Sequence, residues 1–172
     1  MKKKTLYIAI IVFVLALLGT LTYVHQPSGT WICDFSKDDV SIHPRVDSVF
    51  NLFDGLPSEN VSVYLVISPS DQDELPQQLQ RSTVLCASRE DVVKGFAEAA
   101  VFKRTVGDMA TAESMLYIVN NNKVIYKTPI VVSSTCIGIQ NSQLGWCEAV
   151  DPESLVNELT QFDTSCYPRF FF

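Results

Sequence analysis

Hydrophobic and polar positions between residues 61 and 126 follow the patterns of short strands and helices that alternate along the chain. The run VSVYLVIS, which starts at Val61, is apolar on both faces, as is typical of a central strand with helices above and below it. STVLCA, at residues 82–87, predicts a second strand, and the apolar run at residues 115–126 predicts a hairpin. The hairpin turn is expected at NNN, because asparagine tolerates left-handed backbone angles.

Helices are predicted where apolar residues recur at helical spacing. We expect them at residues 43–55, 71–80 and 88–103, the last with a capping pair formed by Ser88 and Asp91. A final helix follows Asp151 as its cap, with Pro152 at the first position. With further strands in TWICDF and PIVVSS, this order predicts an α/β (α+β) fold with a mixed sheet flanked by helices.

The N-terminus reads as a membrane anchor. Residues 5–24 carry no charge and follow three lysines, and about 20 apolar residues at roughly 1.5 Å each match a hydrocarbon core of about 30 Å. The lysines favour a cytoplasmic N-terminus, which places the remainder on the far side of the membrane. A cleaved signal peptide is the alternative, although its apolar region is usually shorter and ends in small residues.

Length and charge set the organisation that we expect. The chain has 172 residues, enough for one domain and an attachment segment: a cytoplasmic tail (1–4), an anchor (5–24), a stalk (25–31) and an exported domain (32–172). Without the three N-terminal lysines, ten basic residues face 19 acidic ones, a charge near −9. Such a surface repels nucleic acid, so no DNA or RNA partner is expected.

Five cysteines lie in the predicted exported part: Cys33, Cys86, Cys136, Cys147 and Cys166. Thiols tend to pair in an oxidising compartment, but five is an odd number, so at least one stays free, is modified or bridges to another molecule. Cys136 and Cys147 bracket a ten-residue loop and are the favoured pair, and Cys33 with Cys166 would tie the two ends together. Cys86 fits a buried core position, a disulfide or a displaced redox thiol.

Motifs for other chemistry are weak. The two histidines, His25 and His43, lack the spacing of metal ligands, and the seven glycines form no phosphate-binding loop, so neither a metal nor a cofactor is expected. The C-terminal Phe170, Phe171 and Phe172 are costly to leave in water. They would fold back on the domain, contact a partner or the nearby bilayer, or serve as a degradation tag.

The strings VYLVISPSDQDELPQQLQ and SMLYIVNNNKVIYK resemble the redoxin branch of the thioredoxin superfamily, which includes membrane-tethered disulfide reductases. The resemblance implies a thioredoxin-like domain over about residues 32–162. In that family a Cys-x-x-Cys precedes the first helix, where this chain has Val40, Ser41, Ile42 and His43. The family's proline before the hairpin strand is also missing, which implies a domain without dithiol exchange.

These observations lead to three hypotheses of function. The first is a single-pass protein of the inner (plasma) membrane whose exported domain is redox-inactive and binds another envelope or membrane protein, for example in an assembly, secretion or conjugation system. The second is an enzyme, a thiol-disulfide oxidoreductase or peroxidase that uses Cys86 or the Cys136/Cys147 pair. The third is a membrane-tethered inhibitor or immunity protein.

Overall fold

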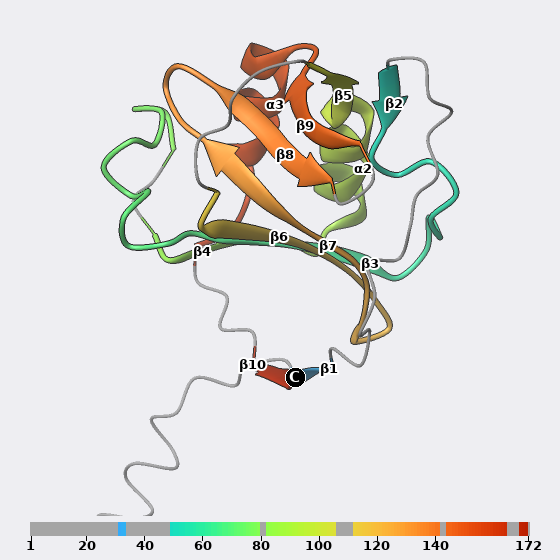
Figure 1. The fold of residues 1–172 in the computed structure, drawn as a ribbon. Coiled ribbons are helices and arrows are strands. Elements are labelled where there is room, and N and C mark those ends of the chain that lie inside the picture. Colours follow the sequence, from blue (N-terminus) through green and yellow to red (C-terminus); the bar gives the residue numbers. More distant parts are fainter. Residues whose placement is uncertain are drawn as a thin grey trace, which may run out of the picture.

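The computed structural model describes residues 31–33, 49–79, 82–105, 112–141, 144–164 and 169–171, and Figure 1 shows their arrangement. Eight strands form one open sheet, and two short helices lie together on one of its faces. We call this the inner face and the opposite one the outer face. The elements are, in chain order, β1 (Trp31–Cys33), β2 (Val49–Asn51), β3 (Val61–Val66), β4 (Val84–Ala87), α2 (Glu90–Ala99), β5 (Val101–Arg104), β6 (Ser114–Asn120), β7 (Lys123–Val132), β8 (Ile137–Asn141), β9 (Gly145–Ala149), α3 (Pro152–Leu159) and β10 (Arg169–Phe171).

The strand order overturns the thioredoxin-like prediction. The sheet runs β2-β5-β9-β8-β7-β6-β3-β4, and every neighbouring pair along this path is antiparallel. A thioredoxin fold has a mixed sheet with several helices, whereas the described residues are mostly β with two short helices. The physical reason is local: short turns join β6 to β7, β7 to β8 and β8 to β9, and strands joined by tight turns pair antiparallel.

Two of the predicted helices are wrong, and a third is too long. Residues 49–51 of the expected first helix form the edge strand β2. Its neighbour β5 contains residues 101–103, which were expected at the end of the third helix. Residues 71–79 form separate turns, with single bonds such as Asp71 N–H to Ser68 O and Leu79 N–H to Pro76 O. Pro76 has no N–H to donate, which prevents a continuous helical ladder there.

Other predictions from local pattern are confirmed. Strands β3 and β4, the β6–β7 hairpin and helix α3 lie where expected, and Asn121 and Asn122 adopt positive φ angles of 49° and 63° in the hairpin turn. The Asp151 carboxylate accepts the Ser154 N–H at 3.0 Å, which is the predicted cap of α3. Helix α2 differs, because its N-cap is Arg89 and makes no side-chain capping bond.

The main core lies between the inner face of the sheet and the two helices. Phe96 of α2 is fully buried and stacks edge-on against Phe162, which follows α3, with ring centroids 5.2 Å apart. Leu155 and Leu159 of α3 are also buried in this core. Both helices are amphipathic and short, so this shared contact with the sheet is what holds them in place.

The strands nearest the two ends of the chain pair with each other. β1 and β10 are parallel, with Ile32 opposite Phe170, and Cys33 pairs with Lys123 at the start of β7. TWICDF therefore does contain a strand, as expected. The expected anchor and stalk, up to residue 30, lie outside the described residues. Among the residues that the structure describes, no helix is long and apolar enough to cross a membrane.

Candidate functional site

A groove of about 680 Å³ lies between the β2–β3 connection and helix α2, and we call it the α2 groove. Two segments that are distant in sequence form its walls. The lining residues are Phe53, Leu56, Pro57, Ser58, Glu59, Asn60 and Val61 on one side and Ser88, Glu90, Val93, Lys94 and Ala97 on the other.

The first wall is tied to the helix by Asn51. Its side-chain amide donates to the carbonyl of Ala97 at 2.7 Å, and its Oδ1 accepts the N–H of Phe53 at the same distance. The Phe53 ring packs edge-on against Phe96, with centroids 5.9 Å apart. Gly55, at φ 81°, then turns the chain where a residue with a Cβ would be strained. The aromatic floor is thus held by a side-chain hydrogen bond and by the core.

The far end of the same connection is held by the β6–β7 hairpin. The Asn120 side chain donates to the carbonyl of Glu59 at 2.6 Å, and Asn121 N–H donates to the carbonyl of Asn60 at 3.2 Å. Asn60 itself adopts a positive φ of 54°, which asparagine accepts more readily than most residues. Since both ends of the connection are bonded to neighbouring elements, the groove is formed before any ligand arrives.

The groove combines an apolar floor with a charged rim. Phe53 and Leu56 are half-buried at the floor, while Glu59, Glu90 and Lys94 are exposed at the rim. Two carboxylates against one ammonium give the rim a negative balance. An apolar floor inside a polar rim is the usual composition of a recognition site.

The structure does not contain the expected Cys136–Cys147 disulfide, because both residues are free thiols. The β8–β9 register places Cys147 opposite Ile139, three positions from Cys136. Three positions amount to about 10 Å along a strand, and an odd offset puts the two side chains on opposite faces of the sheet. A disulfide requires Cα atoms within about 7 Å, so the hairpin register excludes the pair. The ten-residue loop is in fact the β8–β9 hairpin.

Burial raises the pKa of both free thiols above the ordinary value. For Cys136 the nearby Glu148 raises the pKa further, and for Cys147 the opposing effect of Arg104 is smaller than that of burial. The thiolate is the nucleophilic form, so a raised pKa disfavours attack on a peroxide or a disulfide. Cys86 is disulfide-bonded. Cys86, Cys136 and Cys147 therefore lack the activated thiolate that the enzyme hypothesis needs.

A cluster of hydrogen-bonded polar side chains, separate from the groove, fixes the loop after β3. The Asp71 carboxylate accepts both the hydroxyl of Ser114 at 2.6 Å and its N–H at 3.1 Å. Nearby, Ser70 and Ser68 donate to Glu113 at 2.5 and 3.0 Å, and these bonds lower the pKa of that carboxyl group. A carboxylate with a lowered pKa is a poor proton acceptor. This cluster therefore anchors the loop to the start of β6.

The remaining predicted site residues are only partly described. The backbones of Cys33, Phe170 and Phe171 lie in the paired strands β1 and β10, while Cys166 and Phe172 lie outside the described residues. The α2 groove was not expected from the sequence. Its only local signals were Gly55 and the asparagines at residues 60 and 120–122, and these indicate turns without showing that the turns meet α2.

Neither a protein-family model, nor a curated protein, nor a solved structure matches this chain. Within the described ranges, no three His, Cys, Asp or Glu side chains are grouped so as to hold a metal ion. Function therefore has to be inferred from the geometry of the site.

Proposed function

We propose that this chain is a membrane-tethered, exported binding module whose α2 groove receives an exposed segment of another envelope protein. The tether and the compartment are inferred from the sequence of residues 1–24. The binding role is inferred from the groove, and the two parts are tested separately. The thioredoxin-like ancestry has no place in this proposal.

The observation that supports binding is a groove whose walls are fixed before a ligand is bound. Its volume of about 680 Å³ lies within the roughly 300–1,000 Å³ of typical ligand sites. Asn51 and Asn120 bond its walls to α2 and to the β6–β7 hairpin. A site that needs no ordering loses less conformational entropy when it binds, so more of the contact energy becomes affinity.

The lining also indicates the chemistry of the partner. Phe53 and Leu56 offer an apolar floor for one or two hydrophobic side chains, and Glu59 and Glu90 favour a basic residue beside them. An exposed peptide segment with an apolar anchor next to Lys or Arg fits this lining best. The overall acidic charge of the chain, −6 by formal count, would favour the approach of such a segment.

Site-specific photo-crosslinking in intact cells tests the binding role. A benzophenone amino acid at position 97, on the groove wall, is compared with the same probe at position 98, which is exposed on α2 outside the groove. We expect a product of one discrete mass from position 97 only, and weaker crosslinking when Glu59 and Glu90 are both changed to Lys. Equal products from both positions, or none from position 97, would contradict the proposal.

The tether is tested by a reporter fused to the C-terminus. Activity of a reporter that works only outside the cytoplasm supports the proposed compartment. Activity of a cytoplasmic reporter would overturn it and leave the groove as a binding site in another compartment.

A further inference from the structure

The α2 groove has two chemically different ends. At the end near the last turn of α2, the Asn51 side chain donates to the carbonyl of Ala97 at 2.7 Å, and the Phe53 ring packs against Phe96. The N–H of Leu56 donates to the carbonyl of Phe53 at 3.0 Å, so the two apolar side chains of the floor come from residues at this end. This end of the groove is therefore apolar.

The other end of the groove lies at the start of α2. The β3–β4 register places Val63 opposite Ala87, so Val61, two residues earlier, lies close to Ser88, one residue later. Both Val61 and Ser88 line the groove. Residues 53–61 therefore follow α2 from its last turn back to its first.

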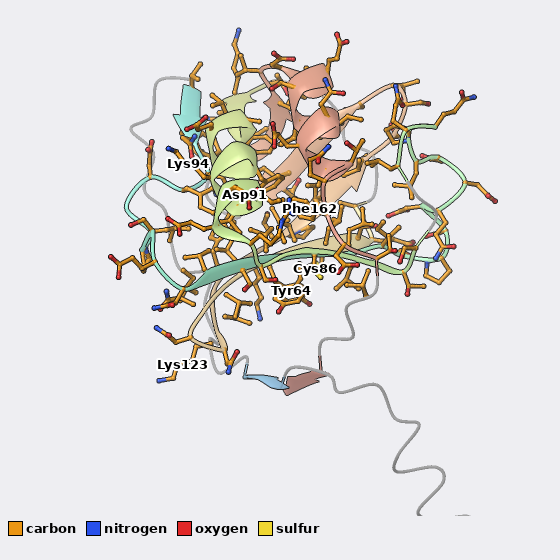
Figure 2. All side chains as sticks on the ribbon, turned by 180° about the vertical axis from the view of Figure 1, so that it is seen from behind. Tyr64, Cys86, Asp91, Lys94, Lys123 and Phe162 are labelled. Atoms are coloured by element: carbon orange, nitrogen blue, oxygen red, sulfur yellow. The ribbon has the colours of Figure 1, made fainter. Side chains whose placement is uncertain are left out.

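Charged side chains mark positions along this direction. Lys94 precedes Ala97 by three residues and Glu90 precedes it by seven, on one face of the helix, which amounts to about 4.5 Å and about 10 Å along the axis. Glu59 lies on the opposite wall, two residues before Val61, toward the same end as Glu90. Figure 2 shows Lys94 on the side of α2 that faces the β2–β3 connection. From the last turn of α2 to its first, the groove is thus apolar, then positive, then negative.

The charges at the rim are available to a ligand. No described residue gives the side chain of Glu59, Glu90 or Lys94 a hydrogen bond or an ion pair. Arg89 and Asp91, which do not line the groove, pair with each other at 3.3 Å. The charged groups that face the groove are therefore the ones left without a partner in the described part of the chain.

We propose that the α2 groove selects an extended segment in which an apolar anchor, an acidic residue and a basic residue follow one another in that order along the groove. The anchor lies on Phe53 and Leu56, the acidic side chain meets Lys94, and the basic side chain lies between Glu59 and Glu90. Any other order brings like charges together and lowers the affinity. This inference rests on the proposed binding role of the groove and adds the pattern that the groove recognises.

The dimensions of the groove favour an extended ligand. An extended chain rises about 3.3 Å per residue, so it covers the roughly 10 Å from anchor to basic residue with about three residues. A helix needs two turns for the same distance, and two turns with a thickness of about 10 Å occupy roughly 800 Å³. That volume exceeds the groove's 680 Å³.

Peptide display on the full-length protein in mild detergent tests the pattern. A library of short random peptides is selected on the wild-type protein, and the binders are then screened against the Glu59→Lys/Glu90→Lys double variant to identify those that depend on the groove. We expect these peptides to carry an apolar residue, Asp or Glu about one or two positions away, and Lys or Arg about three or four positions away on the same side.

The outcomes separate this inference from the proposed function. Groove-dependent peptides without this order, or with the charges at helical spacing, would refute the pattern and still support the binding role. The absence of any groove-dependent peptide would contradict the pattern, while crosslinking from position 97 decides the binding role by itself.

Reversal of the central charge gives a sharper test. Selection on the Lys94→Glu variant should yield peptides with Lys or Arg in place of the acidic residue. In fluorescence anisotropy, a selected peptide should bind this variant about three- to tenfold more weakly than the wild type, and exchange of its acidic residue for Lys should restore the affinity. An unchanged preference at this position would refute the role of Lys94.

Glu90→Lys and Asp91→Lys form a matched pair for the acidic end. Both replace an acidic residue in the first turn of α2 and lose the same favourable interaction with the helix N-terminus, but only Glu90 lines the groove. We expect the selected peptide to bind about three- to tenfold more weakly to Glu90→Lys and less than about twofold more weakly to Asp91→Lys. Equal losses in the two variants would show that the overall charge of the chain, and not the order of charges in the groove, governs binding.

Discussion

Replacing Phe96 with alanine should remove the residue that connects the α2 groove to the main core. Phe96 is 0% exposed and contacts two aromatic rings, Phe53 at 5.9 Å on the groove side and Phe162 at 5.2 Å on the α3 side. Truncation of a buried phenylalanine costs about 3–5 kcal/mol, from lost transfer free energy and from the cavity that remains. Both edge-on ring contacts are lost at once, so we expect the upper part of this range.

This loss is large compared with the whole stability of a domain, which is typically about 5–15 kcal/mol. The matched control is Phe96→Leu, which keeps most of the apolar volume and should cost about 1–2 kcal/mol. Because Phe53 loses its packing partner, crosslinking from position 97 should also weaken in the alanine variant.

Urea unfolding of the full-length protein in mild detergent measures the effect, with the buried Trp146 as the fluorescent reporter. We expect the midpoint to fall while the dependence of the unfolding free energy on urea stays the same. A loss below about 1 kcal/mol for Phe96→Ala would show that this side chain does not hold the helices to the sheet, and the account of the core would be wrong.

Three further predictions follow from single contacts. Gly138→Ala should lower the free energy of unfolding by about 1–3 kcal/mol and shift the fluorescence of Trp146. The reason is that a Cβ at position 138 would press into the indole ring and lie 2.8 Å from a backbone carbonyl oxygen. Unchanged stability and fluorescence would contradict this packing. Asp151→Ala should cost about 1 kcal/mol in urea unfolding through loss of the α3 cap, whereas Asp151→Asn should keep most of it; equal losses in the two variants would rule out a capping role. Alkylation of Cys136 and Cys147 by iodoacetamide should be slow in the native protein at pH 7–8 and accelerate as the pH rises past the ordinary thiol pKa of 9.0. The reason is that burial raises the pKa of both thiols and so favours the protonated form. Rapid labelling at neutral pH would instead support the thiol-enzyme hypothesis.

Local pattern was a good guide wherever neighbouring residues decide the structure. The Asn121–Asn122 turn and the Asp151 cap were predicted correctly, because left-handed backbone angles and a free helix N-terminus are satisfied within a few residues. The apolar character of both faces of β3 was also predicted correctly, since each of its residues is buried or half-buried. The expectation that helices would cover both faces was wrong, because α2 and α3 lie on one face only.

Pairing between strands that are distant in sequence could not be predicted from such local patterns. Residues 49–51 belong to a segment (43–55) in which apolar side chains recur at helical spacing. They nevertheless form β2, because β5 offers an open edge, with Phe50 opposite Phe102. Residues 101–103 were expected in the third helix, but they belong to β5, which pairs with β2 on one side and with β9 on the other. Backbone hydrogen bonds to distant strands outweighed weak local propensity, as is common for short elements.

By itself, then, the sequence determined the hairpin turn, one helix cap, five of the ten described strands and an acidic chain with a charge-free segment near its start. Tertiary structure alone decided that the sheet is antiparallel, that Cys136 and Cys147 stay apart, and that residues 53–61 meet α2 to form the groove. The difference has one physical origin. Turns and caps are satisfied by contacts within a few residues, whereas strand register, cysteine pairing and groove walls join residues that are distant along the chain.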